Sequence, residues 1–291
     1  MTTFGISDIP SLKGRTVVVT GANSGIGRAA ARALAARNAR VVLAVRNPGK
    51  GREAAATMTG DVDVRRLDLA DLASIRAFAA DLTEPVDVLI NNAGVMIPPL
   101  SRTADGFELQ IGTNHLGHFA LTNLLLPRIR GRVVTVSSGA ERQGSIDFDD
   151  LNWEHKPYRA MAAYAQSKLA NMLFTSELQR RLTGAGSPVI ATAAHPGLSA
   201  TNLLRSDGRV RQFVGKVART LAQSDDAGAL PTLYAAVVDV PGNSYAGPDG
   251  FLGVRGAPKL VSRSAKAQDT EVARRLWDVS EELTGVTARA T

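Results

Sequence analysis

The sequence predicts an α/β protein with one doubly wound parallel sheet, covered on both faces by helices in a three-layer α-β-α arrangement. Short apolar runs suited to buried strands alternate with longer segments of helical periodicity. The connections between them are short, which is typical of successive strand–helix–strand units. We find no internal repeat and no low-complexity linker, so a single domain over residues 1–291 is expected.

The first unit is a strand at residues 15–20, the turn Gly21-Ala-Asn-Ser-Gly-Ile-Gly27 and an Ala-rich helix at 28–37. This order places backbone N–H groups and the positive end of a helix where they can bind a phosphate. The glycines permit a tight turn and close approach of a pyrophosphate. The spacing Gly-x-x-x-Gly-x-Gly differs from Gly-x-Gly-x-x-Gly, and an ordinary strand–helix turn with chance glycines is the alternative.

The second strand, at residues 40–45, ends at Arg46. Dinucleotide-binding proteins commonly carry an acid there for the ribose hydroxyls, whereas an arginine suits a 2′-phosphate and favours NADP over NAD. Residues 1–60 hold nine Lys or Arg against two acids, which accounts for the whole net charge of +7. These cations have no aromatic residues among them, so a phosphate-rich small molecule is predicted rather than a nucleic acid. A solvated surface loop is the alternative for Arg46.

The alternation continues along the chain. Further elements are expected as strands at 62–67, 86–91, 132–137, 188–195 and within 245–258, and as helices at 50–58, 71–82, 105–127, 158–182 and 269–283. Asp68 follows one strand and is placed to bond an adenine amino group, and the turn Asn91-Asn-Ala-Gly94 follows the next. Ligands bind at the carboxyl ends of such strands, so these residues are expected near one cleft.

Tyr164 and Lys168 lie four residues apart in the helix expected at 158–182, so their side chains share a face. A free phenol has a pKa of about 10, and a nearby cation favours its ionised form. The pair is therefore a candidate general acid/base. The alternative is an aromatic anchor beside a solvated lysine.

Asn114 lies inside the helix at 105–127, where Asn is unfavourable, so it either faces solvent or has a function.

Several kinds of chemistry are excluded. The chain has no cysteine, which excludes disulfides, a thiol nucleophile and Cys-ligated metals. No Gly-x-Ser-x-Gly is present, so Ser138 is not a hydrolase nucleophile. His115 and His118 lack a third ligand, and no metal site is predicted. With no signal peptide and no apolar run of about 20 residues, we expect a cytoplasmic protein without a membrane span.

Taken in order, these motifs resemble the short-chain dehydrogenase/reductase family over residues 15–285. The resemblance implies a Rossmann-type domain that binds a nicotinamide cofactor. It implies that Tyr164 is the acid/base and that Lys168 lowers its pKa and holds the nicotinamide ribose. Ser138 would orient the substrate oxygen, and Asn114 would anchor a water of a proton relay. The implied cofactor-binding residues are Gly21, Asn23, Ser24, Gly25, Ile26, Gly27, Arg46, Asp68, Leu69, Asn91, Ala93, Gly94, Tyr164, Lys168, Pro196, Gly197 and Thr201.

The gap of 25 residues between Ser138 and Tyr164 is longer than is usual in this family. That gap, with Asn114-His-Leu-Gly-His-Phe119 and Ser167-Lys-Leu-Ala-Asn171, is similar to retinol dehydrogenases and WW-domain-containing oxidoreductases. This implies an apolar carbonyl or alcohol substrate, NADP(H) in preference to NAD(H), and a homodimer or homotetramer. A catalytically idle cofactor-binding regulator or scaffold is the alternative, and such proteins usually lose the Tyr or the Lys.

Two small insertions, near residues 140–160 and 198–222, are expected to cover the substrate. Their apolar residues would either form the walls of a pocket or pack a local core. These residues are Phe148, Trp153, Tyr158, Leu198, Leu203, Leu204 and Phe213.

Overall fold

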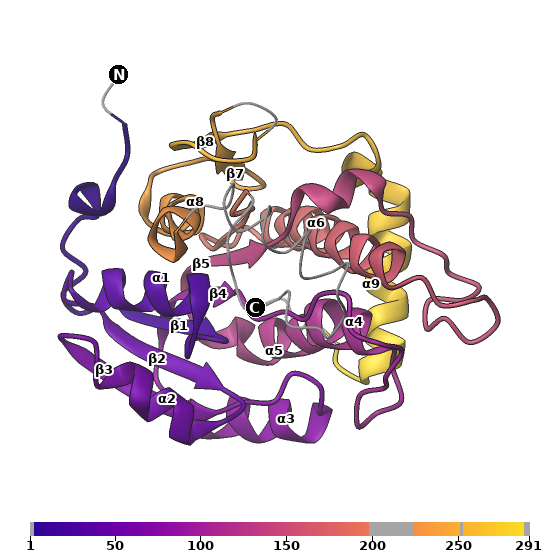
Figure 1. Ribbon diagram of the computed structural model, residues 1–291, viewed down its shortest axis with the longest axis horizontal. Helices are drawn as coiled ribbons and strands as arrows, with labels where there is room; N and C mark the ends of the chain where they lie inside the picture. The colour runs from indigo at the N-terminus through magenta and orange to yellow at the C-terminus, as the bar shows by residue number, and fades with distance from the viewer. Residues whose placement is uncertain (1–2, 198–223, 251–252, 288–291) are drawn as a thin grey trace, which may run out of the picture.

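A computed structural model describes residues 3–197, 224–250 and 253–287 (Figure 1). In this part of the chain eight strands form one sheet in the order β3-β2-β1-β4-β5-β6-β7-β8. Neighbouring strands are parallel except β7 and β8, which are antiparallel. The strands are β1 (Thr16–Thr20), β2 (Arg40–Val45), β3 (Asp61–Arg66), β4 (Val86–Asn91), β5 (Ile129–Val136), β6 (Ile190–Ala194), β7 (Tyr245–Pro248) and β8 (Pro258–Leu260). The predicted doubly wound α/β fold is confirmed.

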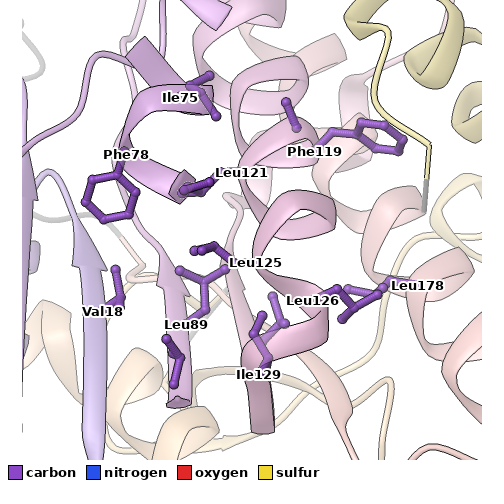
Figure 2. Packing of buried hydrophobic residues seen from close by; sticks show 14 of the residues in the cluster. Val18, Ile75, Phe78, Leu89, Phe119, Leu121, Leu125, Leu126, Ile129 and Leu178 are labelled. Carbon is purple, nitrogen blue, oxygen red and sulfur yellow. The ribbon is translucent and has the colours of Figure 1, made fainter. Parts of the chain in front are cut away.

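Helices cover both faces of the sheet because alternate strand residues point to opposite sides. Val19 and Ile90 belong to a core packed with α1 (Gly25–Ala35) and α8 (Asp225–Val237), and α2 (Pro48–Ala55) borders the same core. Val18 and Leu89 belong to the core on the other face, which is drawn in Figure 2. That face is covered by α3 (Leu72–Asp81), α5 (Gly117–Leu125) and α6 (Ala160–Gly184).

The last helix, α9 (Thr270–Thr284), closes the layer formed by α5 and α6. Its Trp277 is 2% exposed and stacks on Phe174 of α6, with ring centroids 5.8 Å apart. The same indole meets Phe119 of α5 edge-on at 4.9 Å. Burying three aromatic rings against one another fixes α9 on the helices that carry the site residues described below.

The segment expected to be one helix at 105–127 is interrupted. It begins with α4 (Leu109–Ile111), continues through a π-helical turn (Gly112–Leu116) and ends in α5. Glu108 sets the start, because its carboxylate accepts the N–H groups of residues 110 and 111. Asn114 lies in the π turn, and such turns are frequent at functional sites.

Two other features differ from the sequence expectation. The strand expected within 245–258 is β7, and a second, unexpected strand, β8, pairs with it in the antiparallel direction at Pro258–Leu260. Helix α8 was not predicted, because Pro231 lies inside it and proline normally argues against a helix interior. No helix in the described ranges is long and apolar enough to cross a membrane.

Candidate active site

A cleft of about 640 Å³ opens at the carboxyl ends of the parallel strands. Each of the first five strands is followed by a residue that lines it: Gly21 after β1, Arg46 after β2, Asp68 after β3, Ala93 after β4 and Ser137 after β5. The chain therefore brings together, at one edge of the sheet, residues that are far apart in the sequence. This is where a doubly wound sheet binds its ligands.

The glycine turn fits a pyrophosphate by its shape. Gly21 has a φ of +67°, a conformation that suits glycine, and it lines the cleft. A Cβ on Gly27 would lie 2.3 Å from the Asn92 side-chain nitrogen, so only glycine lets α1 pack so closely. Ser24 occupies the N-cap of α1 without a side-chain cap bond, which leaves the first helical N–H groups to another acceptor. The predicted residues Asn23, Ser24, Gly25 and Ile26 also line the cleft.

Two cations lie at the far end of the cleft. Arg46 is exposed at the end of β2, and Lys50 follows it on the first turn of α2. Asn47 fixes that turn, because its side-chain oxygen accepts the Lys50 N–H at 3.1 Å. Among the described residues neither cation is in an ion pair with an acid. The sequence analysis named neither Lys50 nor Asn47 as a site residue, and the excess of positive charge in residues 1–60 was the available signal for Lys50.

Asp68 and Leu69 line the cleft after β3, as predicted. The Asp68 carboxylate accepts the Ala70 N–H at 3.0 Å, and its own N–H donates to Ser74 Oγ at 3.0 Å. These bonds fix the turn, and the Asp68 carboxylate keeps lone pairs that can accept hydrogen bonds from a ligand in the cleft. The adenine contact proposed for Asp68 stays a prediction.

Helix α6 places Tyr164 and Lys168 together at the inner end of the cleft. Both are buried, at 8% and 4% exposure, so Lys168 is not a solvated lysine. The Lys168 ammonium donates to the Val136 carbonyl at 3.1 Å and lies 5.7 Å from the centroid of the Tyr164 ring. Ser138 follows β5, and its side chain hydrogen-bonds to Tyr164. The structure therefore brings together the three residues that the resemblance implied.

Burial dominates the electrostatics of the pair. Burial raises the pKa of Tyr164, and the hydrogen bond with Ser138 lowers it by a smaller amount. Burial also lowers the pKa of Lys168 to about 8. Desolvation disfavours the charged form of both groups. The phenol is therefore held in its protonated form in the protein alone. The expected lowering of the Tyr164 pKa by Lys168 stays a prediction.

Asn114 is fully buried and does not face solvent. Its Oδ1 accepts the Val95 N–H at 2.8 Å, and its Nδ2 donates to the Val95 carbonyl at 3.0 Å and to Ser167 Oγ at 2.9 Å. Both side-chain donors are thus used by protein groups. The Oδ1 accepts one N–H and keeps a lone pair, and the backbone carbonyl accepts from His118 Nδ1 at 3.0 Å. The water of a proton relay at Asn114 stays a prediction.

The two histidines of α5 and its π turn have structural partners. His118 Nε2 lies 2.9 Å from Thr20 Oγ1, which itself accepts the N–H groups of Asn92 and Ala93. The Asn114 carbonyl can only accept, so Nδ1 carries the proton in the neutral ring and Nε2 accepts from the Thr20 hydroxyl. His115 Nε2 bonds Ser280 at 2.8 Å. No group of three or more candidate metal ligands lies in the part of the chain described.

Two of the expected cofactor-binding residues, Asn91 and Gly197, do not line the cleft. Asn91 is buried, donates to Thr122 Oγ1 at 2.8 Å and does not line the cleft; Asn92 lines it instead. As the last residue of β4, Asn91 points between the sheet and α5. Pro196 lines the cleft as predicted, but Gly197 does not and packs against the Val254 carbonyl. Thr201 lies outside the described residues.

The aromatic residues of the first insertion pack locally. Trp153 and Tyr158 meet edge-on at 5.6 Å, and the Tyr158 hydroxyl donates to Glu108 at 2.9 Å. Phe148 lies under the Arg275 guanidinium at 4.1 Å. None of the three lines this cleft, and their contacts favour the local-core interpretation. The remaining candidates, Leu198, Leu203, Leu204 and Phe213, lie outside the described residues.

The apolar side of the cleft comes from a segment that sequence reasoning missed. Residues 95–99, here called the apolar wall, line the cleft directly after the turn Asn91-Asn-Ala-Gly94: Val95, Met96, Ile97, Pro98 and Pro99. Their hydrophobic character and their position after a ligand-binding turn were the available signal. Thr113, from the π turn, lines the same region.

Comparison with known proteins identifies the family. The family model for short chain dehydrogenases matches residues 15–150. Retinol dehydrogenase 13 of Homo sapiens is 45% identical, over 96% of this chain and 87% of the human protein. A crystal structure of an uncharacterised protein from Mycobacterium paratuberculosis has a TM-score of 0.87 and 53% identity, covering 99% of both chains.

A second solved structure carries a cofactor. It is assigned as an NAD(P)-dependent gluconate 5-dehydrogenase of Beutenbergia cavernae, holds NADP, and has a TM-score of 0.59 and 30% identity over 78% of this chain and 91% of that chain. The chain thus belongs to the short-chain dehydrogenase/reductase family, in the subgroup similar to retinol dehydrogenases, and is an NAD(P)-dependent dehydrogenase that acts on CH–OH groups.

Proposed function

We propose that the protein transfers a hydride between NADP(H) and an apolar carbonyl or alcohol, with Tyr164 as the general acid/base. The observation that carries this proposal is the position of the Tyr164 side chain. It lines the inner end of the cleft, is hydrogen-bonded to Ser138 and lies beside Lys168. When bound, the nicotinamide supplies the hydride donor or acceptor.

The residues at the inner end of the cleft would transfer the proton and stabilise the charge on the substrate oxygen. In the reducing direction the carbonyl carbon accepts a hydride, and the carbonyl oxygen takes a proton from the Tyr164 hydroxyl, which gives the alcohol. Ser138 is a second donor toward the oxygen as it gains charge. Burial favours a protonated Tyr164, which suits proton donation to a carbonyl. Lys168 favours the phenolate left behind, because its ammonium lies beside the ring.

The preference for NADP(H) rests on Arg46 and Lys50. Both line the end of the cleft where β2 stops, and no acid ends that strand. A phosphate on the adenosine ribose would be attracted by both cations, whereas a free hydroxyl would gain little from them. The NADP found in the Beutenbergia cavernae structure supports this choice. NAD(H) would bind at the same site more weakly.

The apolar substrate is supported by the apolar wall at residues 95–99. It offers hydrophobic surface close to Tyr164 and few polar side chains to compete for a hydrophilic substrate. The relative retinol dehydrogenase 13 is named for retinol, an apolar alcohol, which supports the same substrate class here. An idle regulator is not favoured, since Tyr164 and Lys168 are both present in the cleft.

Turnover of a panel of aldehydes, ketones and alcohols with NADPH, NADH and their oxidised forms tests this proposal. We expect the highest kcat/KM for apolar aldehydes or alcohols with the phosphorylated cofactor. Binding of NADPH without turnover of any panel member would support the idle regulator instead. A preference for polar, charged substrates would contradict the role given to the apolar wall.

A further inference from the structure

Ile97, in the middle of the apolar wall, has an unusual backbone conformation. Its φ is +55°, and of the four non-glycine residues with positive φ in the described ranges it is the β-branched one. A β-branched residue in this region is a genuine outlier, because its side chain crowds its own backbone. Such conformations persist only where the surroundings over-determine them, and they cluster at functional sites. Ile97 lines the cleft.

The group that holds Ile97 is the side chain of Gln110. Its Oε1 accepts the Ile97 N–H at 2.9 Å. Its Nε2 donates to the Tyr158 hydroxyl at 2.9 Å and to the Ala160 carbonyl at 2.8 Å. The orientation of the Gln110 amide is therefore determined, because the flipped form would place its NH2 group against the Ile97 N–H, which is also a donor. Gln110 is fully buried, so these bonds are not shared with solvent.

The same contacts tie the apolar wall to the catalytic helix. Ala160 is the first residue of α6, one turn before Tyr164. Two residues before Ile97, the backbone of Val95 is fixed on both sides by Asn114. The segment from Val95 to Ile97 is thus held at both ends, by side chains from α4 and the π turn that follows it. Its position relative to the Tyr164 hydroxyl is set by buried amides and not by loose loop packing.

We propose that Ile97 is a specificity-determining residue that contacts the apolar body of the substrate, and that Gln110 is the positioning residue that holds it there. The inference rests on the function proposed above and names the residue that selects the substrate. Glycine or asparagine would adopt this backbone conformation at lower cost. An isoleucine held here by a buried amide presents a branched apolar side chain to the cleft at a fixed place.

A series of straight-chain aldehydes from butanal to decanal, reduced with saturating NADPH, tests the assignment. The short members reach the carbonyl site without extending along the wall, whereas the long ones need it. For Ile97→Ala we expect the KM of decanal to rise about tenfold, the KM of butanal to stay unchanged and kcat to change little. Ile97→Leu, which keeps the apolar volume, should restore most of the preference for long chains.

Gln110→Met removes the acceptor of the Ile97 N–H and should raise the KM of decanal in the same way, with NADPH affinity unchanged. Gln166→Met is the matched control. Gln166 is also a buried glutamine of this region, and its Nε2 donates to the Leu151 carbonyl at 3.0 Å, but it does not line the cleft. It should lower thermal stability without altering the ratio of the two KM values.

The outcomes separate this inference from the proposed function. If the wild-type protein reduces the aldehydes but Ile97→Ala shifts all KM values equally, the specificity role is wrong and the proposed reaction stands. If Gln166→Met changes the KM ratio as much as Gln110→Met does, the positioning role is wrong. If the wild-type protein binds NADPH and reduces no member of the series, the proposed reaction fails and this inference fails with it.

Discussion

The side-chain amide of Asn114 bonds both polar groups of one backbone residue, Val95. Its Nδ2 donates to the Val95 carbonyl at 3.0 Å, and its Oδ1 accepts the Val95 N–H at 2.8 Å. Asn114 lies in the π-helical turn before α5, and this turn holds its side chain where it can make both bonds. The irregular helix and the apolar wall of the cleft are therefore one hydrogen-bonded unit.

Replacing Asn114 should damage both stability and turnover. In Asn114→Leu the buried polar groups of Val95 lose their partners, and each unsatisfied group costs about 1–3 kcal/mol. We expect a lower urea midpoint and a large loss of kcat/KM. Asn123→Leu is the control, since Asn123 is also buried but donates only to the Phe119 carbonyl of its own helix. Equal effects of the two substitutions would contradict a special role for the Asn114–Val95 pair.

Cofactor preference should depend on Arg46. Charge-assisted hydrogen bonds contribute about 1.5–3 kcal/mol, so Arg46→Ala should weaken NADPH binding by tenfold or more and leave NADH binding nearly unchanged. Lys50→Ala should act in the same direction. Arg52→Ala, an exposed cation of the same helix that does not line the cleft, should change neither. Fluorescence titration with both cofactors checks this, and equal weakening for NADPH and NADH would overturn the 2′-phosphate assignment.

Stability should fall in mild acid because three histidines are buried in neutral form. Burial lowers the pKa of His115 to about 3 and the pKa values of His118 and His195 to about 4, against 6.5 when free. The unfolded chain therefore binds more protons between pH 6.5 and 4, so stability is lost as the pH falls through this window. By pH 5 the loss is about 1–2 kcal/mol per histidine.

Urea unfolding at pH 7, 6 and 5 measures this loss. His118→Gln cannot gain a proton and should show a shallower dependence on pH, although its starting stability is lower. Replacement of the exposed His155 by Gln should leave the dependence as in the wild type. Identical midpoints for the wild type at pH 7 and 5 would mean that these histidines are not held neutral.

Much of the fold could be predicted because its signals are local. The apolar runs of β1, β2 and β4 suit buried strands, and the glycine turn between β1 and α1 follows from the spacing of Gly21, Gly25 and Gly27. The pairing of Tyr164 with Lys168 follows from helical geometry alone. Helix α8 could not be predicted in this way, because Pro231 lies inside it and proline disfavours a helix interior. Packing of α8 against the sheet overrides this local preference.

The parts of the site that were missed depend on tertiary position. Lys50 reaches the cleft because Asn47 starts α2 directly beside Arg46. The aromatic residues of the first insertion look like pocket residues in the sequence, but Tyr158 is bound by Glu108 and Gln110 away from the cleft. The raised pKa of Tyr164 results from burial, which no spacing of residues reveals.

The most direct test of the proposed chemistry compares cofactor binding with turnover in Tyr164→Phe. This substitution removes one hydroxyl and keeps the buried ring. We predict an unchanged dissociation constant for NADPH and a decrease in the turnover of the best apolar aldehyde of about 100-fold or more. Turnover within a few-fold of the wild type would show that the Tyr164 hydroxyl is not the group that moves the proton.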